Sequence, residues 1–360
     1  MKIGIITFTY GQNFGNKLQN YALLRVLQTK YGKKVFTLQN FDTTTKGTII
    51  TRVKRRIKLI LGLKGERIKQ KKQKIFNEFN KENLNYYPIT LTKENYEKLQ
   101  DFDVLVCGSD QIWNPWYSKD IDMFTGKFAK ESKRISYAAS IGLDELPEKY
   151  VEPWTNAWMD MYGIGVREES AISLIEKYTK RKSVLQIDPT MLLGREEWSK
   201  FEKKPCRRTP SKYIVTYFIC EMNSEAQEKV NELAKKRDCE VIHLNNIYRK
   251  EWYDISPNEF VYLIHHAEFV IADSFHATVF SIIFGKEFHC LQRVYENNSD
   301  KQGSRLETLL GYFGLQNRYG YDKKFCEEKL SDDRINEILS MMQKKSLRSL
   351  FDMIEDKKGN

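Results

Sequence analysis

The chain alternates short apolar segments with segments of helical periodicity, and this alternation limits its fold more than any other feature. The isoleucine-rich residues 2–8 are followed by apolar residues at helical spacing over 17–31, and further apolar segments lie at 35–38, 103–107, 134–139, 164–166 and 184–187. Strands of a parallel sheet are buried on both faces and are therefore almost continuously apolar. The alternation predicts a doubly wound α/β domain, in which ligands bind beyond the carboxyl ends of the strands.

A second series of the same units follows residues 203–212, a polar and basic stretch with two prolines that is typical of an interdomain linker. It contains apolar strand segments at 212–219, 240–244 and 268–272 and a helical segment at 224–237. A chain of 360 residues is long enough for two domains. We therefore predict two Rossmann-like domains with a cleft between them, divided as 1–202, a linker at 203–212, 213–330, and a final helical segment at 331–360 that packs back on the first domain.

Positive charge is concentrated in residues 49–75, which we call the basic arm. Between Arg52 and Lys74 there are eleven Lys or Arg residues and one acid, Glu66, whereas the net charge of the whole chain is +11. The rest of the chain is almost neutral, which argues against nucleic acid as a partner. Because many aliphatic residues accompany the charges, contact with an anionic membrane surface is slightly favoured over a solvated, mobile helix pair.

No apolar run approaches the roughly 20 residues that a membrane-spanning helix needs. The first residues, MKIGIITF, have strand character and lack the cleavage site of a signal peptide. The six cysteines have no zinc-like spacing, so we expect reduced thiols and no metal centre. These features predict a cytoplasmic protein that reaches the inner face of the membrane through the basic arm.

The strongest candidate site is the segment FVIADSFHATVFSIIF at residues 269–284, in which an apolar strand leads through Ser274 and Phe275 to His276 and an apolar helix. The turn between a strand and a helix presents free backbone N–H groups and the positive end of the helix, which favour a bound anion. The pattern predicts an anion site that carries His276 as an acid. A structural interpretation fits equally well, with Asp273 or Ser274 capping the helix and His276 making a core hydrogen bond.

A second candidate is Arg167, which follows the predicted strand at 164–166 and opens a helix. The planar guanidinium group can make paired hydrogen bonds to a phosphate or a carboxylate. An ion pair with Glu168 or Glu169 is an equally good explanation of its position.

Two polar loops are weaker candidates. The loop after the strand at 103–107 contains Asp110 and Trp113, a mixture of polar and aromatic residues that is typical of carbohydrate contact, although a packed turn explains each residue more simply. The loop after the first strand, GQNFGN, contains Asn13 and Asn16 and precedes Gln19. It lacks the G-x-G-x-x-G pattern, which lowers the case for a dinucleotide-binding dehydrogenase.

Seven motifs, in order along the chain, resemble those of the polysaccharide pyruvyl transferase family. They cover roughly residues 1–320 and are NFGNKLQNYAL from Asn13, VLVCGSDQIWN from Val104, ISYAASIG from Ile135, VREES from Val166, DPTMLL from Asp188, DSFHATVFSIIFGKEF from Asp273 and SRLETLL from Ser304.

The resemblance implies two Rossmann-like domains arranged as in the GT-B glycosyltransferases. It implies transfer of the enolpyruvyl unit of phosphoenolpyruvate to a sugar of a surface polysaccharide or of its lipid-linked precursor, with a pyruvate ketal and phosphate as products. No cofactor is implied. His276 matches the family's general acid, and Arg167 matches an arginine that holds the donor. Asn16 stands where many relatives carry an acidic residue, which puts its part in acceptor binding in doubt.

Phosphoenolpyruvate carries a carboxylate and a phosphate, so its site needs fixed positive charge. The residues expected on the donor side are Arg167, Ser274, Phe275, Lys286 and Arg305. Those expected on the acceptor side are Asn13, Asn16, Gln19, Asp110 and Trp113.

Two other functions compete with this interpretation. A nucleotide-sugar glycosyltransferase of polysaccharide synthesis would share the architecture and could place a diphosphate at the same helix end. A membrane-docked scaffold for polymer assembly would depend on the basic arm but not on His276.

Overall fold

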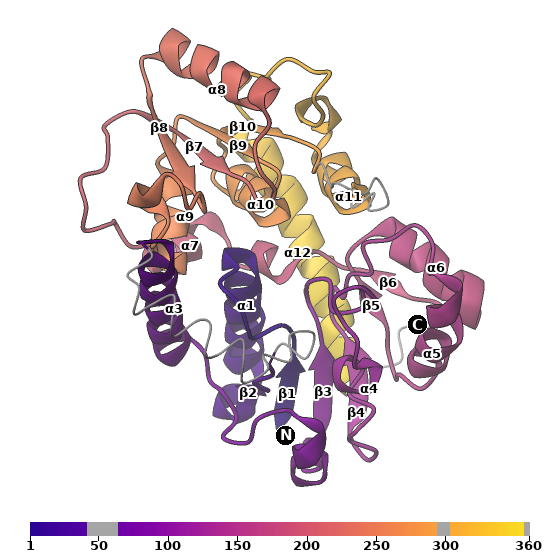
Figure 1. The fold of residues 1–360 in the computed structure, drawn as a ribbon. Helices are drawn as coiled ribbons and strands as arrows, with labels where there is room; N and C mark the ends of the chain where they lie inside the picture. The colour runs from indigo at the N-terminus through magenta and orange to yellow at the C-terminus, as the bar shows by residue number, and fades with distance from the viewer. Residues whose placement is uncertain (42–63, 294–302, 356–360) are drawn as a thin grey trace.

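Two parallel sheets organise the chain in the computed structural model, which describes residues 1–41, 64–293 and 303–355 (Figure 1). The first sheet has the order β2-β1-β3-β4. Its strands are β1 (Ile3–Ile6), β2 (Val35–Thr37), β3 (Val104–Cys107) and β4 (Lys133–Ser136). Every residue of β1 and β3 is buried, as expected for apolar strands in the middle of a covered parallel sheet.

The second sheet has the order β10-β9-β7-β8 and is also parallel throughout. It consists of β7 (Tyr213–Tyr217), β8 (Glu240–Leu244), β9 (Phe269–Ala272) and β10 (Glu287–Cys290). A smaller parallel pair, β5 (Gly165–Val166) and β6 (Val184–Leu185), continues the first sheet through a bridge between Ala139 and Val166. The predicted α/β fold is therefore confirmed, with two doubly wound lobes.

Helices connect the strands within each lobe. The first lobe contains α1 (Phe14–Tyr31), α3 (Lys64–Asn83), α4 (Ile121–Phe124), α5 (Glu148–Met159) and α6 (Glu169–Thr179). The second contains α8 (Ser224–Arg237), α9 (Pro257–His265), α10 (Phe275–Ile283) and α11 (Ser304–Phe313). The short α7 (Arg195–Phe201) contacts α9, and residues 203–212 then lead to β7 without forming a helix or strand.

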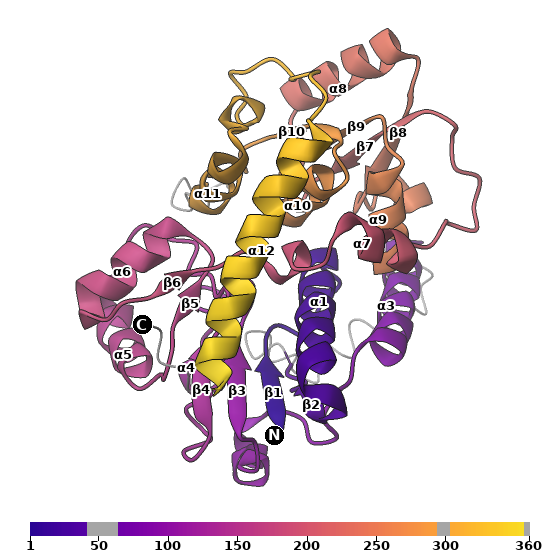
Figure 2. The same cartoon turned by 180° about the vertical axis from the view of Figure 1, so that it is seen from behind.

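The last helix, α12 (Asp332–Glu355), runs along the back of both lobes (Figure 2). Near its end the carbonyl of Ile354 accepts a hydrogen bond from Nζ of Lys133, beside β4. In its middle, Oγ of Ser346 accepts from the backbone N–H of Ile187. The helix contacts α11 of the second lobe as well, so it bridges the two sheets.

One lysine of the basic arm is buried in the protein and does not face outward. Residues 49–63 lie outside the described residues, but residues 64–75 form the start of α3. Lys72 of this helix is buried, donates to Oδ1 of Asn245 (2.9 Å), and lies 4.9 Å from the centroid of the Phe14 ring. Burial lowers the pKa of Lys72 to about 8. This lysine therefore joins the lobes and is not available to a membrane.

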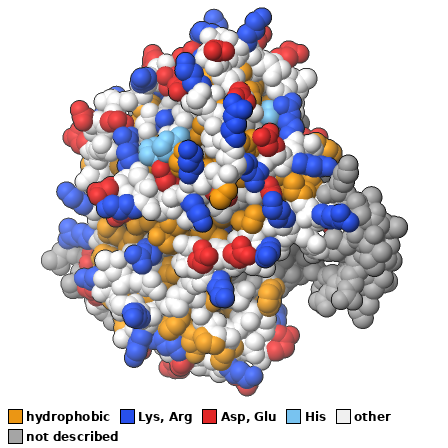
Figure 3. Space-filling model, turned by 90° about the vertical axis from the view of Figure 1, so that its left-hand side faces the viewer, with side chains coloured by type: hydrophobic (Ala, Val, Ile, Leu, Met, Phe, Trp, Pro, Cys, Tyr) orange, Lys and Arg blue, Asp and Glu red, His pale blue; other side chains and the backbone are white. Residues whose placement is uncertain are grey.

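Charges of both signs alternate over the face of the molecule shown in Figure 3. In α3, Lys71 pairs with Asp254 and Lys74 with Glu78. Contact of the basic arm with an anionic membrane stays a prediction. Of the helices in the described residues, none combines the length and apolar character required to traverse a bilayer.

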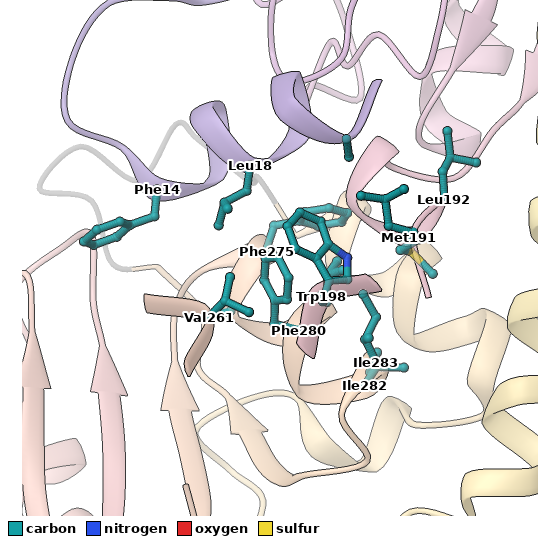
Figure 4. Close-up of a cluster of buried hydrophobic side chains, with 14 of the residues drawn as sticks. Phe14, Leu18, Met191, Leu192, Trp198, Val261, Phe275, Phe280, Ile282 and Ile283 are labelled. Atoms are coloured by element: carbon teal, nitrogen blue, oxygen red, sulfur yellow. The ribbon is translucent and has the colours of Figure 1, made fainter. Parts of the chain in front are cut away.

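Aromatic and aliphatic side chains form the core between the lobes (Figure 4). The ring of Phe14, at the start of α1, stacks on Phe260 of α9 with 4.6 Å between the centroids. Trp198 of α7 packs on Phe280 of α10 at 4.9 Å, and its Nε1 donates to the carbonyl of Thr190 (2.8 Å). All three of Phe14, Phe260 and Trp198 are fully buried. The lobes therefore share one apolar core.

Replacing Trp198 with alanine should lower the free energy of unfolding by about 3–5 kcal/mol, because it leaves a large cavity in this core. Trp116→Ala is the matched control, since the Trp116 side chain is 45% exposed and its loss should cost about 0.5 kcal/mol or less. Calorimetric unfolding of both variants provides the measurement. Equal destabilisation by the two substitutions would contradict the role given to the shared core.

Candidate active site

A pocket of about 290 Å³ lies between the two lobes, beyond the carboxyl ends of β1, β3 and β9. We call it the interlobe pocket. Both sheets point their carboxyl ends toward it, which is where doubly wound folds bind ligands. Its lining comprises Phe8, Tyr10, Asn13, Asn16, Asp110, Gln111, Tyr117, Ile219, Ser274, Phe275, His276, Arg293 and Arg305.

His276 enters the pocket from the first turn of α10. Ser274 is the N-cap of this helix, and its side chain accepts from the backbone N–H of Ala277 (3.5 Å). The Nε2 atom of His276 lies 3.5 Å from Oδ2 of Asp188. The Nδ1 edge of the ring faces Gly15 at the start of α1, where a Cβ atom would lie 2.0 Å from Nδ1. Both edges of this ring, which belongs to the second lobe, thus face residues of the first lobe.

Asp188 is the counter-ion of two groups. Its Oδ2 accepts a hydrogen bond from Nη1 of Arg167 (2.6 Å), and its Oδ1 accepts from the hydroxyl of Thr190 (2.7 Å). Burial by itself would raise the pKa of the Asp188 carboxyl, but His276, Arg167 and Thr190 outweigh it and hold that pKa well below its usual range. The carboxylate therefore stays ionised beside His276.

Arg167 lies just behind the pocket wall. It follows β5, as predicted, and its guanidinium group stacks on the ring of Phe275, 4.4 Å from the centroid. Its Nη2 is 3.5 Å from Oδ1 of Asp110, and the whole residue is buried. The ion-pair partners of Arg167 are therefore Asp188 and Asp110, and not Glu168 or Glu169. Arg167 does not line the pocket itself, but it contacts two residues that do.

Positive charge inside the pocket comes from Arg293 and Arg305. Nε of Arg293 donates to the carbonyl of Asp273 (2.9 Å). Burial, together with the nearby cations Arg167 and Arg293, lowers the pKa of Arg305 to about 10. A guanidinium group held close to two others gains from a bound anion, so this wall of the pocket is suited to a carboxylate or a phosphate.

The structure brings some of the predicted acceptor residues to this pocket and leaves others away from it. Asn13 and Asn16 line it from the start of α1, where Oδ1 of Asn13 accepts from the N–H of Asn16, and Asp110 lines it from the loop after β3. Gln19 is fully buried and bonds to Oγ1 of Thr7. Trp113 is also fully buried, and its Nε1 donates to the carbonyl of Phe124. The last two residues occupy the core of the first lobe, as a packed turn would require.

Of the predicted donor residues, Ser274, Phe275 and Arg305 line the pocket with His276. Lys286 does not join them. It follows the carboxyl end of α10, whereas His276 lies in the first turn, and the charges around it are those of Glu268, Arg195 and Asp332.

Sequence reasoning missed Arg293 and Asp188. Arg293 follows β10 in the way that Arg167 follows β5, so the same signal, an arginine after the carboxyl end of a strand, could have identified it. Asp188 gives no separate signal, because Asp-Pro-Thr is a normal way to end a strand in a turn. Its Oδ1 does accept such a turn bond from the N–H of Thr190.

Within the described residues, one group of side chains is close enough to share a metal ion: Glu202, His265 and His266. The carboxylate of Glu202 already bonds to both imidazoles, at 2.7 and 3.0 Å, and the group lies at the carboxyl end of α9. It does not belong to the interlobe pocket.

Two doubly wound lobes with a pocket between them give the chain the architecture of the GT-B-like class, and a histidine and several guanidinium groups lie at the strand ends beside this pocket. The family model for polysaccharide pyruvyl transferase matches residues 13–293, and the chain belongs to this family. It is therefore a transferase of polysaccharide synthesis, as its motifs predicted, and a polysaccharide is the acceptor that the family implies.

One solved structure supports the fold, and a second is similar at a lower score. The UDP-GlcNAc 2-epimerase from Neisseria meningitidis bound to UDP-GlcNAc is 12% identical with a TM-score of 0.55, and the match covers 99% of this chain and 100% of that one. A glycosyltransferase from Rickettsia africae is 11% identical with a TM-score of 0.48 over 99% of both chains. At such low identity the similarity concerns the fold alone. None of the curated proteins searched matches the sequence.

Replacing Asp188 with asparagine should destabilise the protein by about 3–5 kcal/mol at pH 7, because it removes the nearer of the two counter-ions of the buried Arg167 and leaves only Asp110, at 3.5 Å. The pKa of Asp188 is depressed in the folded state, so its stabilising effect is present above the usual aspartate pKa of about 3.9 and is lost as the pH falls below it. The variant should therefore lose less stability than the parent between about pH 5 and pH 2.

Thermal unfolding across this pH range provides the measurement. Asp144→Asn, at an exposed loop position, is the control and should behave like the parent protein. If the Asp188 variant loses as much stability between about pH 5 and pH 2 as the parent protein does, the ion pair between Asp188 and Arg167 does not have the role given to it here.

Proposed function

We propose that this protein transfers pyruvate from phosphoenolpyruvate to a sugar of a polysaccharide or its precursor, as a ketal, with His276 as the general acid. One observation carries the proposal: a histidine paired with a buried carboxylate lines the same pocket as two guanidinium groups and a helix N-terminus. Family membership supplies the reaction class, and the pocket supplies groups suited to this donor.

The donor has two anionic groups, and the pocket offers two kinds of positive site. The guanidinium groups of Arg293 and Arg305 can form paired hydrogen bonds with one of them. The N-terminus of α10, at Ser274 and Phe275, favours the other through its backbone N–H groups and dipole. Such a donor would lie directly against His276.

The chemistry then needs a proton at the methylene carbon. Protonated His276 gives its proton to that carbon, which becomes a methyl group, while a sugar hydroxyl attacks the adjacent carbon and its proton returns to the imidazole. The C–O bond to phosphate then breaks, and a second hydroxyl bonds to the same carbon to close the ketal and gives its proton to the departing phosphate. Because Nε2 faces Asp188, we assign the transferred proton to Nδ1, on the edge of the ring near Gly15.

Asp188 and Arg167 have supporting roles in this scheme. The carboxylate of Asp188 lies 3.5 Å from Nε2 of His276 and is the charge partner of the imidazolium that this scheme requires. Arg167 holds Asp188 in place and packs behind Phe275. We therefore assign to Arg167 a positioning role rather than a direct contact with the donor.

The decisive experiment mixes the purified protein with phosphoenolpyruvate and a glycan acceptor and follows inorganic phosphate together with pyruvylated glycan. Both products are expected in equal amounts. Release of a nucleoside diphosphate from a sugar nucleotide, without phosphate release from phosphoenolpyruvate, would instead identify a glycosyltransferase and overturn the proposal.

His276→Ala should lower kcat by at least about 10²-fold while phosphoenolpyruvate still binds, because the substitution removes the proton donor and leaves both arginines in place. Phosphate release measures kcat, and calorimetric titration measures donor binding. His265→Gln is the control, since His265 lies outside the pocket, and its kcat should match that of the parent. Near-normal turnover by the His276 variant would rule out the acid role.

Gly15→Ala should reduce kcat on the order of 10²-fold through misplacement of the imidazole. The new Cβ would lie within 2.6 Å of three ring atoms of His276, so the ring must turn away. Gly311→Ala is the control, because that helical glycine has no atom nearer than 3.9 Å to its added Cβ. If Gly15→Ala retains full phosphate release, the position of the ring does not matter and the proposed proton transfer is wrong.

A further inference from the structure

A second pocket of about 310 Å³ adjoins the interlobe pocket and has no part in the scheme above. It lies beyond the carboxyl ends of β7 and β8, and its lining includes Ile219, Gln227, His243, Asn245 and Arg249. Ile219 lines the interlobe pocket as well, and its side chain is 41% exposed. The two pockets therefore adjoin at Ile219.

A chain of hydrogen bonds fixes a guanidinium group at this second pocket. Nη1 of Arg249 donates to Nε2 of His243, and Nδ1 of His243 bonds to Oγ1 of Thr216 (2.8 Å). A guanidinium group can only donate, so Nε2 of His243 must accept and its Nδ1 carries the hydrogen. His243 is 5% exposed, and burial and the adjacent Arg249 lower its pKa to about 4. The imidazole is thus a neutral support that orients Arg249.

Other features add positive potential. Gln227 lies in the first turn of α8, whose N-terminus carries the positive end of the helix dipole, and its Oε1 is 3.4 Å from Nη2 of Arg249. On the opposite side, the buried ammonium group of Lys72 donates to Oδ1 of Asn245. One acid, Glu221, is among the lining residues. The pocket therefore combines an oriented guanidinium group with hydrogen-bonding amides.

We propose that the second pocket binds a phosphate ester carried by the acceptor glycan. This inference rests on the proposed function, because it takes the interlobe pocket as the place of transfer. Planar guanidinium groups match phosphate oxygens with paired hydrogen bonds, whereas a neutral sugar would not need a cation supported by a buried histidine. The ester is a glycosyl phosphate or diphosphate, linked to a nucleoside or to a lipid.

The position of Arg249 favours the acceptor over the donor. The two anionic groups of phosphoenolpyruvate have their own partners in the interlobe pocket, next to His276. The acceptor must present its hydroxyl groups there too, and the rest of it must extend out of a space of about 290 Å³. The second pocket, across Ile219, lies on such a path.

Binding provides the first test. Inorganic pyrophosphate is titrated into the full-length protein with phosphoenolpyruvate present to fill the interlobe pocket. Arg249→Gln should weaken pyrophosphate binding by at least about tenfold, because it removes a charge-assisted hydrogen bond. Lys250→Gln removes a neighbouring positive charge outside the pocket lining and should bind pyrophosphate as the parent does. Equal pyrophosphate affinity in the parent and the Arg249 variant would overturn the inference.

Kinetics separates this inference from the proposed function. Arg249→Gln should raise the KM for a glycan 1-phosphate about tenfold while the KM values for phosphoenolpyruvate and for the same glycan without phosphate stay unchanged. His243→Leu should also raise the KM for the glycan 1-phosphate, because Arg249 loses its support. His243→Gln should raise this KM less than His243→Leu does, because the amide oxygen of glutamine can still accept a hydrogen bond from Arg249. An equal rise in KM for both glycans would show that the pocket does not recognise phosphate.

Acceptors linked through diphosphate to a nucleoside and to a polyprenol identify the carrier, because the natural one should show the larger rise in KM in the Arg249 variant. Failure of the proposed function would appear differently, as absence of phosphate release from phosphoenolpyruvate in the parent protein, whatever its affinity for pyrophosphate.

Discussion

The buried carboxylate of Asp188 is the contact on which the geometry of the site depends. It follows β6 in the first lobe and touches Arg167 after β5 and His276 on α10 of the second lobe. An ionised carboxylate in a protein interior is costly unless it is paired and hydrogen-bonded, and here cations and a hydroxyl group surround it. The need to pair this carboxylate accounts for the positions of Arg167, Thr190 and His276 around it. The ionised state of Asp188, the contact between the lobes and the orientation of the imidazole therefore depend on one another.

The fold was predictable because its signals are local. Apolar strands separated by helical segments indicated both sheets, and Ser274 is the N-cap that the turn before His276 suggested. The environment of each side chain was harder to predict. Gln19 and Trp113 have the chemistry of sugar contacts, yet both are fully buried, and a polar or aromatic residue type alone does not tell a core position from a pocket wall.

The partners of charged side chains were equally hard to predict from the sequence. Arg167 was identified from its position after a strand, but its partners, Asp188 and Asp110, come from loops 21 and 57 residues away in the sequence. The basic arm was defined by composition, whereas Lys72 within it points into the protein and bonds to Asn245 of the second lobe. Tertiary contacts of this kind leave no periodic signal, so composition describes the net charge of a segment but not where each charge lies.

Access to the site follows from how the lobes are joined. Phe14, Phe260 and Trp198 are fully buried between them, and separating the lobes would expose each ring at about 1.5–3 kcal/mol or more. Opening would also remove His276 from both Asp188 and Gly15, which belong to the other lobe. Substrates therefore reach His276 without separation of the lobes, from the side where Ile219 and Tyr117 are 41% and 37% exposed. Ile219 also lines the second pocket, which contains Arg249. The open side of the interlobe pocket is therefore the side on which we propose that Arg249 binds the phosphate ester of the acceptor.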